Sequence, residues 1–162
     1  MRTEKIEFKY NIYNSIDELS KDEQELVKKA ILAVDNSYAP YSQFHVGAAA
    51  LLENGEIIQG NNIENTVSPV CICAERTALF SAAAQYPDTK ILKLAITAKA
   101  DNFELEEPAS PCGSCRQVLV EFETKQQHPI KVILYNRNHI ISIESARYLL
   151  PLTFDETRLK KQ

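Results

Sequence analysis

The sequence contains no tryptophan, only 4 glycines and no excess of basic side chains: 18 Lys and Arg stand against 22 Asp and Glu, for a net charge of −4. A nucleic-acid backbone is bound through a clustered basic face, so this balance argues against a polynucleotide partner. No apolar run approaches the length of a membrane span, and the charged residues 1–5 lead into no apolar segment. We therefore expect no nucleic acid, no membrane contact and no signal peptide, which leaves small-molecule chemistry open.

The 162 residues, 44% of them hydrophobic and 25% charged, are typical of a globular chain that can bury a sizeable core. No internal repeat, low-complexity segment or linker interrupts them, so we expect residues 1–162 to form a single domain. Residues 1–19 alternate apolar and polar side chains without a clear period, which suggests a strand-like arm.

The hydrophobic periodicity predicts helices and strands in alternation. The capping-box pattern of Ser20 and Glu23 predicts a helix that ends before Pro40, and Asn54-Gly55 predicts a hairpin turn. The expected strands are 45–53, 56–61, 91–97, 130–135 and 140–143, and the further expected helices are 74–85, 113–123 and 144–150. This order predicts an α/β fold, a three-layer α/β/α sandwich with a mixed sheet of about five strands. The short turn 136–138 makes the last two strands antiparallel, since a parallel crossover needs a longer connection.

The four cysteines form two close pairs, Cys71 with Cys73 and Cys112 with Cys115. In a chain without an export signal, such pairs indicate a metal or catalytic site more often than disulfides. Cys112 and Cys115 are three residues apart at a predicted helix start, so their thiols can point the same way. Cys73 stands at the start of another predicted helix, and both helix N-termini favour the thiolate form.

Glu75 follows Cys73 by two residues, which on a regular helix places the two side chains about 200° apart. Both reach one metal-bound water only if Cys73 lies at the irregular edge of its helix. In that case, Glu75 is a carboxylate placed to move protons beside the metal.

Cys73-Ala74-Glu75 and Pro111-Cys112-x-x-Cys115 resemble the signature of the zinc-dependent nucleobase deaminases in its three-cysteine form. The strings at 73–78 (CAERTA) and 111–117 (PCGSCRQ) are similar to free-nucleoside cytidine deaminases in particular. Further segments resemble the same family, and they are residues 41–48, 61–65 and 149–154. The likeness extends in order from about Tyr38 to Phe154, and residues 1–20 are an additional N-terminal arm to which it assigns no role.

The resemblance implies a role for each matching residue. It implies one Zn²⁺ per subunit held by Cys73, Cys112 and Cys115, with Glu75 as the catalytic proton shuttle. It implies that Asn62 and Glu64 bind the ribose hydroxyl and that Phe44 lies beside the base. It also implies that Phe154 enters the pocket of a neighbouring subunit and that Arg76 contacts the zinc-bound sulfurs. Three thiolates on Zn²⁺ sum to −1, so Arg76 would withdraw charge and restore acidity to the bound water.

The activity implied is hydrolysis of cytidine and deoxycytidine to uridine and deoxyuridine with release of ammonia, as in pyrimidine salvage. A cytoplasmic homo-oligomer, a tetramer in this family, is implied as well. Two alternatives stay open: a deaminase of a blasticidin S-type antibiotic nucleoside, and a non-catalytic zinc-binding interaction domain. Residues 66–69 (Thr-Val-Ser-Pro) and Leu152 depart from the family pattern.

Plainer interpretations exist for the same residues. Cys71 fits no ligand position and is expected to be a free thiol, although a closed four-cysteine zinc site would include it. Asn62 and Glu64 could end a strand, and Phe44 and Phe154 could be ordinary core aromatics. His45, His128 and His139 are scattered, and we expect none of them to be a metal ligand.

Overall fold

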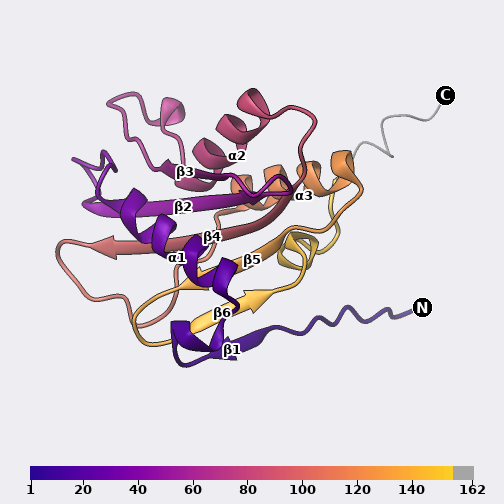
Figure 1. The fold of residues 1–162 in the computed structure, drawn as a ribbon. Coiled ribbons are helices and arrows are strands. Elements are labelled where there is room, and N and C mark those ends of the chain that lie inside the picture. Colours follow the sequence, from indigo (N-terminus) through magenta and orange to yellow (C-terminus); the bar gives the residue numbers. More distant parts are fainter. Residues whose placement is uncertain (155–162) are drawn as a thin grey trace.

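Helices and strands alternate along residues 1–154, the part of the chain that the computed structural model describes (Figure 1). The main elements are β1 (Asn11–Tyr13), α1 (Lys21–Val34), β2 (Phe44–Leu52), β3 (Ile57–Asn61), α2 (Ala74–Gln85), β4 (Ile91–Ala100), α3 (Gly113–Gln126), β5 (Lys131–Tyr135) and β6 (Ile140–Ile143). Three short 3-10 helices accompany them: η1 (Ile16–Glu18), η2 (Ser68–Val70) and η3 (Ala146–Leu149). In this part of the chain, no helix combines the length and apolarity needed to cross a bilayer.

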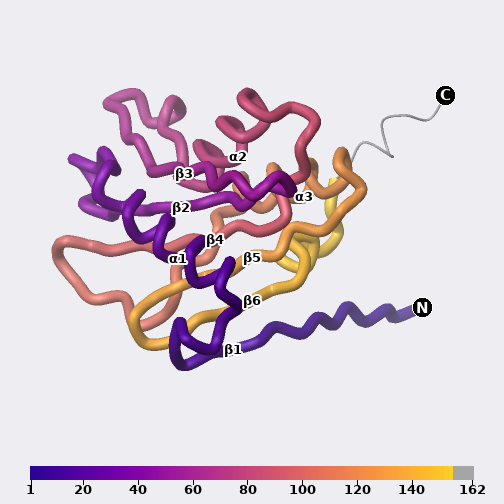
Figure 2. The backbone as a smooth tube through the Cα atoms, viewed as in Figure 1, coloured from indigo at the N-terminus to yellow at the C-terminus, as the bar shows by residue number. Residues whose placement is uncertain are grey.

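The six strands form one sheet in the order β1-β6-β5-β4-β2-β3, in which only β4 and β5 are parallel. The predicted antiparallel pairing of the last two strands is confirmed, and α3 makes the one crossover between parallel neighbours. The sheet has one strand more than the five expected, because residues Asn11–Tyr13 of the N-terminal arm pair with β6. The arm continues from that sheet edge toward the N-terminus (Figure 2).

Helices cover both faces of the sheet, which confirms the three-layer α/β/α architecture (Figure 1). On one face, Ala48 and Ala50 of β2 belong to a core with Ala78 and Leu79 of α2 and Leu119 of α3. On the other face, α1 closes a smaller core that includes Leu26, Val27, Ala49, Ala95 and Ile133. Successive strand residues point to opposite faces, so β2 contributes alternately to both cores.

Gly60 in β3 determines how close α2 lies to the sheet. A Cβ at this position would overlap the backbone C=O of Ala74 and the backbone N of Ala78. Glycine therefore lets the first turn of α2 rest directly on β3. This contact fixes the N-terminal end of α2, where Cys73 and Glu75 are found.

The predicted helix 144–150 is wrong in kind, because only the 3-10 helix η3 forms there. Its N-terminal N–H groups are bound by a side chain of another helix: the buried Glu123 of α3 accepts from the backbone N of Ala146 at 2.8 Å and of Arg147 at 3.2 Å. The same carboxylate accepts from Ile130 at 2.7 Å. This long-range anchor holds the segment in a short turn before Pro151.

Glu23, at the start of α1, is a carboxylate whose side chain is only 6% exposed, and it pairs with two lysines of the sheet. Its Oε1 lies 2.9 Å from the Nζ of both Lys93 and Lys131, and its Oε2 accepts from the backbone N–H of Ser20 at 3.2 Å. Burial by itself would raise the pKa of Glu23, but the bonds from Lys131 and Lys93 outweigh it and lower the pKa to about 2. The ion pairs tie α1 to β4 and β5.

Replacing Glu23 by Gln is expected to lower the free energy of unfolding by about 3 kcal/mol at neutral pH, because two half-buried ammonium groups lose their carboxylate. A carboxyl with a lowered folded pKa stabilises the fold above its unfolded value, 4.5, and this contribution disappears as the pH falls toward about 2. Urea unfolding of both proteins should show the difference shrinking as the pH is lowered through that range. Glu25→Gln is the control, since Glu25 pairs with Lys29 on the surface at 3.8 Å. A difference that is the same at all pH values would contradict the expectation.

Candidate metal centre

Two helix N-termini bring three cysteine sulfurs together. Cys73 is the N-cap of α2, Cys112 is the N-cap of α3, and Cys115 lies in the first turn of α3. Their Sγ atoms all lie within 4.8 Å of one another, with 3.9 Å between Cys73 and Cys112 and 3.5 Å between Cys112 and Cys115. Thiolates about 2.3 Å from a tetrahedral Zn²⁺ are separated by about 3.8 Å, so this donor set fits zinc in chemistry and in size.

The backbone at each N-cap explains this convergence. Cys73 (φ −81°, ψ 153°) and Cys112 (φ −67°, ψ 167°) are both extended, while their C=O groups accept the first helical hydrogen bonds, from Thr77 and Arg116 at 3.0 Å. An N-cap side chain leaves the helix at a different angle from the residues within it. Cys73 is thus at the irregular edge of α2, which is the condition under which it and Glu75 can serve one site.

The thiols of Cys73 and Cys115 have pKa values shifted in opposite directions. Hydrogen bonding from Cys115, together with the Arg76 guanidinium, lowers the pKa of Cys73 to about 5. The pKa of Cys115 is raised, first by its bond to the Cys73 thiolate and then by burial. A bound divalent cation would lower the pKa of Cys115 again, because thiolate ligands are deprotonated when a metal binds.

Glu75 is a carboxyl group only 4% exposed at the N-terminal end of α2. Burial raises its pKa, the nearby Cys73 thiolate raises it further, and a bond from Cys115 offsets part of the change. A raised pKa makes a carboxyl group a stronger base and brings it closer to the range in which it can both accept and donate a proton. Its position beside the sulfur cluster suits proton transfer at that centre.

Arg76 contacts the cluster from within α2. Its Nη2 donates to the Cys73 Sγ at 3.4 Å and to the backbone C=O of Cys71 at 3.5 Å. Its Nε is buried and, among the described residues, has no hydrogen-bond partner. The guanidinium therefore places a positive charge next to the sulfur that is most readily ionised.

The segment around Ile63 lies beside the cysteine cluster. Ile63 and Ile72 exchange two backbone hydrogen bonds of 3.0 Å, so Asn62 and Glu64 flank the strand-like bridge that leads to Cys73. The Asn62 side chain accepts from the backbone N of Val46 at 2.8 Å and donates to the C=O of Phe44 at 2.9 Å. Asn62 therefore fixes the start of β2, and among the described residues these two bonds leave one amide hydrogen and one lone pair of its side chain open to another partner.

Glu64 points back to the loop before β2. Its Oε2 accepts the backbone N–H groups of Tyr41 at 2.8 Å and Ser42 at 3.2 Å. The bonds from the Ser42 side chain and from the backbone N–H of Tyr41 lower the pKa of Glu64, which favours the carboxylate form. The structure thus presents an ionised acceptor next to Asn62.

Phe44, the first residue of β2, shares a sheet face with Val46 and Ala48, which pack into the core under α2 and α3. Its ring stacks on Phe103, with centroids 6.4 Å apart and planes inclined by 24°. Phe103 was not singled out by sequence reasoning, because one aromatic residue in a loop carries no pattern. Phe154 is 60% exposed, and its C=O accepts from the Gln117 side chain of α3 at 2.9 Å.

Cys71 and the histidines lie outside the three-sulfur cluster. The Sγ of Cys71 accepts from the backbone N of Asn65 at 3.2 Å. His45 contacts Ser37 at 2.6 Å and Asp101 at 3.2 Å, His139 contacts Glu107 at 2.9 Å, and His128 contacts a backbone C=O.

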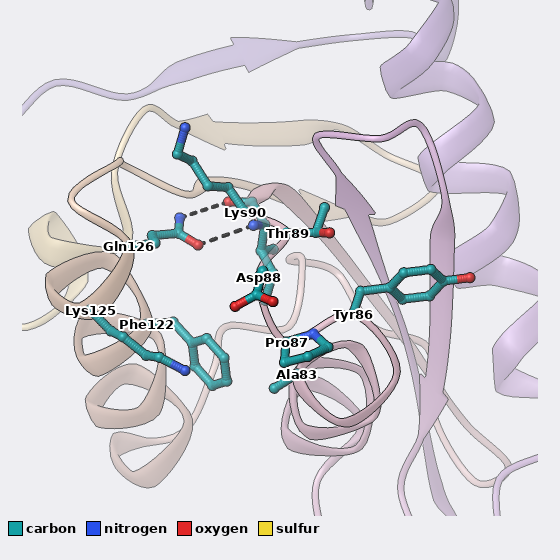
Figure 3. A pocket seen from close by; sticks show the side chains of 10 residues that line it. Ala83, Tyr86, Pro87, Asp88, Thr89, Lys90, Phe122, Lys125 and Gln126 are labelled. Carbon is teal, nitrogen blue, oxygen red and sulfur yellow. Dashed lines mark hydrogen bonds between the residues drawn. The ribbon is translucent and has the colours of Figure 1, made fainter.

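A pocket of about 240 Å³ lies away from the cysteines, at the C-terminal ends of α2 and α3. Figure 3 shows Phe122 and Lys125 on one side and the segment from Tyr86 to Lys90 on the other. Gln126 closes one wall, since its side chain bonds to both the backbone N and the C=O of Ile91. The pocket is lined by neither the cysteine cluster nor Glu75.

Comparisons with known proteins show the family to which the chain is similar. A family model described as the cytidine and deoxycytidylate deaminase zinc-binding region matches residues 20–128. The chain is 47% identical to a cytidine deaminase of Halalkalibacterium halodurans over 133 residues, 82% of this chain and 94% of that protein. It is 39% identical to one of Sporosarcina psychrophila over 138 residues, 85% of this chain and 95% of that protein. The crystal structure of cytidine deaminase from Burkholderia pseudomallei superposes with a TM-score of 0.69 at 37% identity, covering 80% of this chain and 97% of that one.

Proposed function

We propose that this chain, which belongs to the cytidine and deoxycytidylate deaminase family, hydrolyses cytidine and deoxycytidine to uridine and deoxyuridine with release of ammonia. The observation that carries the proposal is the buried Glu75 carboxyl group beside three sulfur atoms spaced for one zinc ion. A purely structural zinc site has no use for a buried carboxyl group there, so the non-catalytic alternative is not favoured.

The family is a zinc-binding one, and we assign Cys73, Cys112 and Cys115 as the zinc ligands. When bound, Zn²⁺ supplies Lewis acidity and activates water for nucleophilic attack. Three thiolates on a divalent cation leave a net charge of −1, which opposes this activation. The Arg76 guanidinium, 3.4 Å from the Cys73 Sγ, offsets that charge.

Glu75 moves the protons in the proposed reaction. It takes a proton from the attacking water and delivers it to N3 of the cytosine ring as oxygen bonds to C4. It then transfers the second proton of that water to the C4 amino group, and the C–N bond breaks to release ammonia. C4 keeps the oxygen as a carbonyl, so water and cytidine are converted to uridine and ammonia with all atoms accounted for.

The nucleoside is held by residues from other elements. Glu64, an ionised acceptor, and Asn62, with one free amide hydrogen and one free lone pair, are assigned to the ribose hydroxyls. Phe44 is assigned to the base, because it begins β2 on the sheet face that α2 and α3 cover. Phe154, which is largely exposed, is assigned to the pocket of a neighbouring subunit.

The proposed assembly is a homotetramer of single-domain subunits, with residues 1–162 as one domain and residues 1–20 as its additional arm. Support comes from the exposure of Phe154 and from the exposed apolar side chains near the candidate site, Tyr41, Val67 and Val70, which a second copy would cover. We also propose a role in pyrimidine salvage and a cytoplasmic location, with which a free nucleoside substrate is compatible.

The decisive experiment follows the loss of cytosine absorbance when the zinc-loaded protein is incubated with each candidate substrate. We expect turnover of cytidine and deoxycytidine, and none of cytosine-containing oligonucleotides. Blasticidin S is included in the same panel. Turnover of blasticidin S alone would assign the protein to the deaminases of antibiotic nucleosides. Turnover of none of the four would overturn the proposal, and sedimentation of the same preparation measures the assembly.

A further inference from the structure

The loop from residue 101 to 112 connects β4 to the proposed cysteine ligands of α3, and its first three residues contact residues 43–45 at the start of β2. Asp101 pairs with His45 at 3.2 Å, the Asn102 side chain bonds to that of Gln43, and Phe103 stacks on Phe44. The backbone N of Asp101 also donates to the C=O of Gln43 at 3.1 Å. The contacts extend the β2–β4 pairing beyond Phe44 and Ala100, where the ladder ends.

Gln43 is held in the left-handed region at φ 54°, which is unusual for a residue with a side chain. Backbone strain of this kind persists where surrounding contacts determine it, and it is found most often at functional sites. Here the contacts are its bond to the C=O of Ala39 at 3.0 Å and its two bonds to the loop. These contacts thus fix the backbone of Gln43, the residue immediately before Phe44.

Residues 105 and 106 of the loop are also held by hydrogen bonds. Asn136 donates to the C=O groups of Leu105 at 3.2 Å and Glu106 at 2.9 Å, and Asn138 donates to that of Glu106 at 3.0 Å. The loop is therefore held on both sides of Phe103, and this fixes the position of that residue. Yet Phe103 is 58% exposed, so an apolar surface next to Phe44 is left uncovered by the described residues 1–154.

We propose that Phe103 is a further substrate-contacting residue, which with Phe44 forms an aromatic wall against the cytosine base. The inference rests on the proposed function. Phe44 is on the sheet face that α2 and α3 cover, and the N-termini of these two helices carry the cysteine cluster. The loop that bears Phe103 ends at Cys112. A flat heteroaromatic ring is the ligand that an exposed, rigidly held aromatic surface binds best, because stacking is favourable on any base. The Asp101–His45 and Asn102–Gln43 contacts are positioning contacts that hold the wall.

The test measures kcat and KM of Phe103→Ala with both cytidine and deoxycytidine, together with the zinc content and the dissociation constant of uridine. We expect KM and the uridine dissociation constant to rise about tenfold, with kcat within about twofold of wild type and zinc unchanged. The factor should be the same for both nucleosides, because the base is common to them. Phe103→Tyr should restore wild-type values, and Phe103→Leu should not.

Phe8→Ala is the matched control, because Phe8 also stacks on an exposed ring, that of Tyr148 at 6.0 Å, and has no role in the proposed site. Its KM should equal that of wild type. Three results would overturn the inference: a Phe103→Ala KM within twofold of wild type, a loss of kcat that accompanies zinc loss, or a changed native mass showing that the ring serves subunit contact. A wild-type protein without activity would instead overturn the proposed function, so the two failures are distinguishable.

Discussion

Glu75→Gln is expected to lower kcat for cytidine at least about 1,000-fold while zinc remains bound, within the range that general acid–base groups contribute. The amide has nearly the same shape as the carboxyl group, so the packing of this buried side chain is retained. It cannot take a proton from water or deliver one to N3 and then to the amino group. The measurement is the absorbance assay at saturating cytidine, with zinc per chain determined on the same sample.

Glu121→Gln is the matched control for this substitution, because Glu121 is an exposed glutamate on α3, the helix that begins at the proposed zinc ligands Cys112 and Cys115. It should leave kcat unchanged. If Glu75→Gln kept more than about a tenth of the wild-type kcat, another group would have to move the protons. A loss of zinc in Glu75→Gln would assign this side chain to metal retention instead.

Most of the candidate site could be predicted from the sequence because its information is local. Cys73, Glu75 and Arg76 lie within four residues, and Cys112 and Cys115 within another four, each set at a helix start. Helix starts are marked by short-range signals, and it is the family resemblance that predicts the convergence of the two N-termini on one metal site. The extended backbone of Cys73 could not be predicted, because an N-cap conformation depends on the residues on both sides.

The parts that could not be predicted depend on long-range contacts. β1 forms because residues Asn11–Tyr13 find the free edge of β6, which lies more than 120 positions away in the chain. The segment 144–150 has a helical pattern, but Glu123 binds its N-terminal N–H groups and limits it to η3. Phe103 meets Phe44 through the β2–β4 register, and no local pattern encodes that pairing.

Replacing Cys73, Cys112 or Cys115 by Ser is expected to weaken zinc binding more than about 100-fold, beyond the 10- to 100-fold cost of losing an outer contact. A serine hydroxyl stays protonated where a thiol ionises, and zinc prefers the softer sulfur. Turnover should fall in proportion to zinc. The measurement is metal content by atomic spectroscopy after dialysis against a chelator, followed by the activity assay.

Cys71→Ser is the control that separates an open site from a closed one. In the structure, the Cys71 sulfur bonds to the backbone of Asn65 and lies outside the three-sulfur cluster, so this variant should keep both zinc and activity. Loss of zinc from it would indicate four sulfur ligands, with no position left for water. Arg76→Gln should fall between the ligand variants and Cys71→Ser, with zinc binding or turnover lowered about 10- to 100-fold, because the guanidinium contacts the cluster sulfurs and is not itself a proposed metal ligand. This graded order distinguishes a catalytic zinc site tuned by its surroundings from a structural one, in which Arg76 would have no effect on turnover.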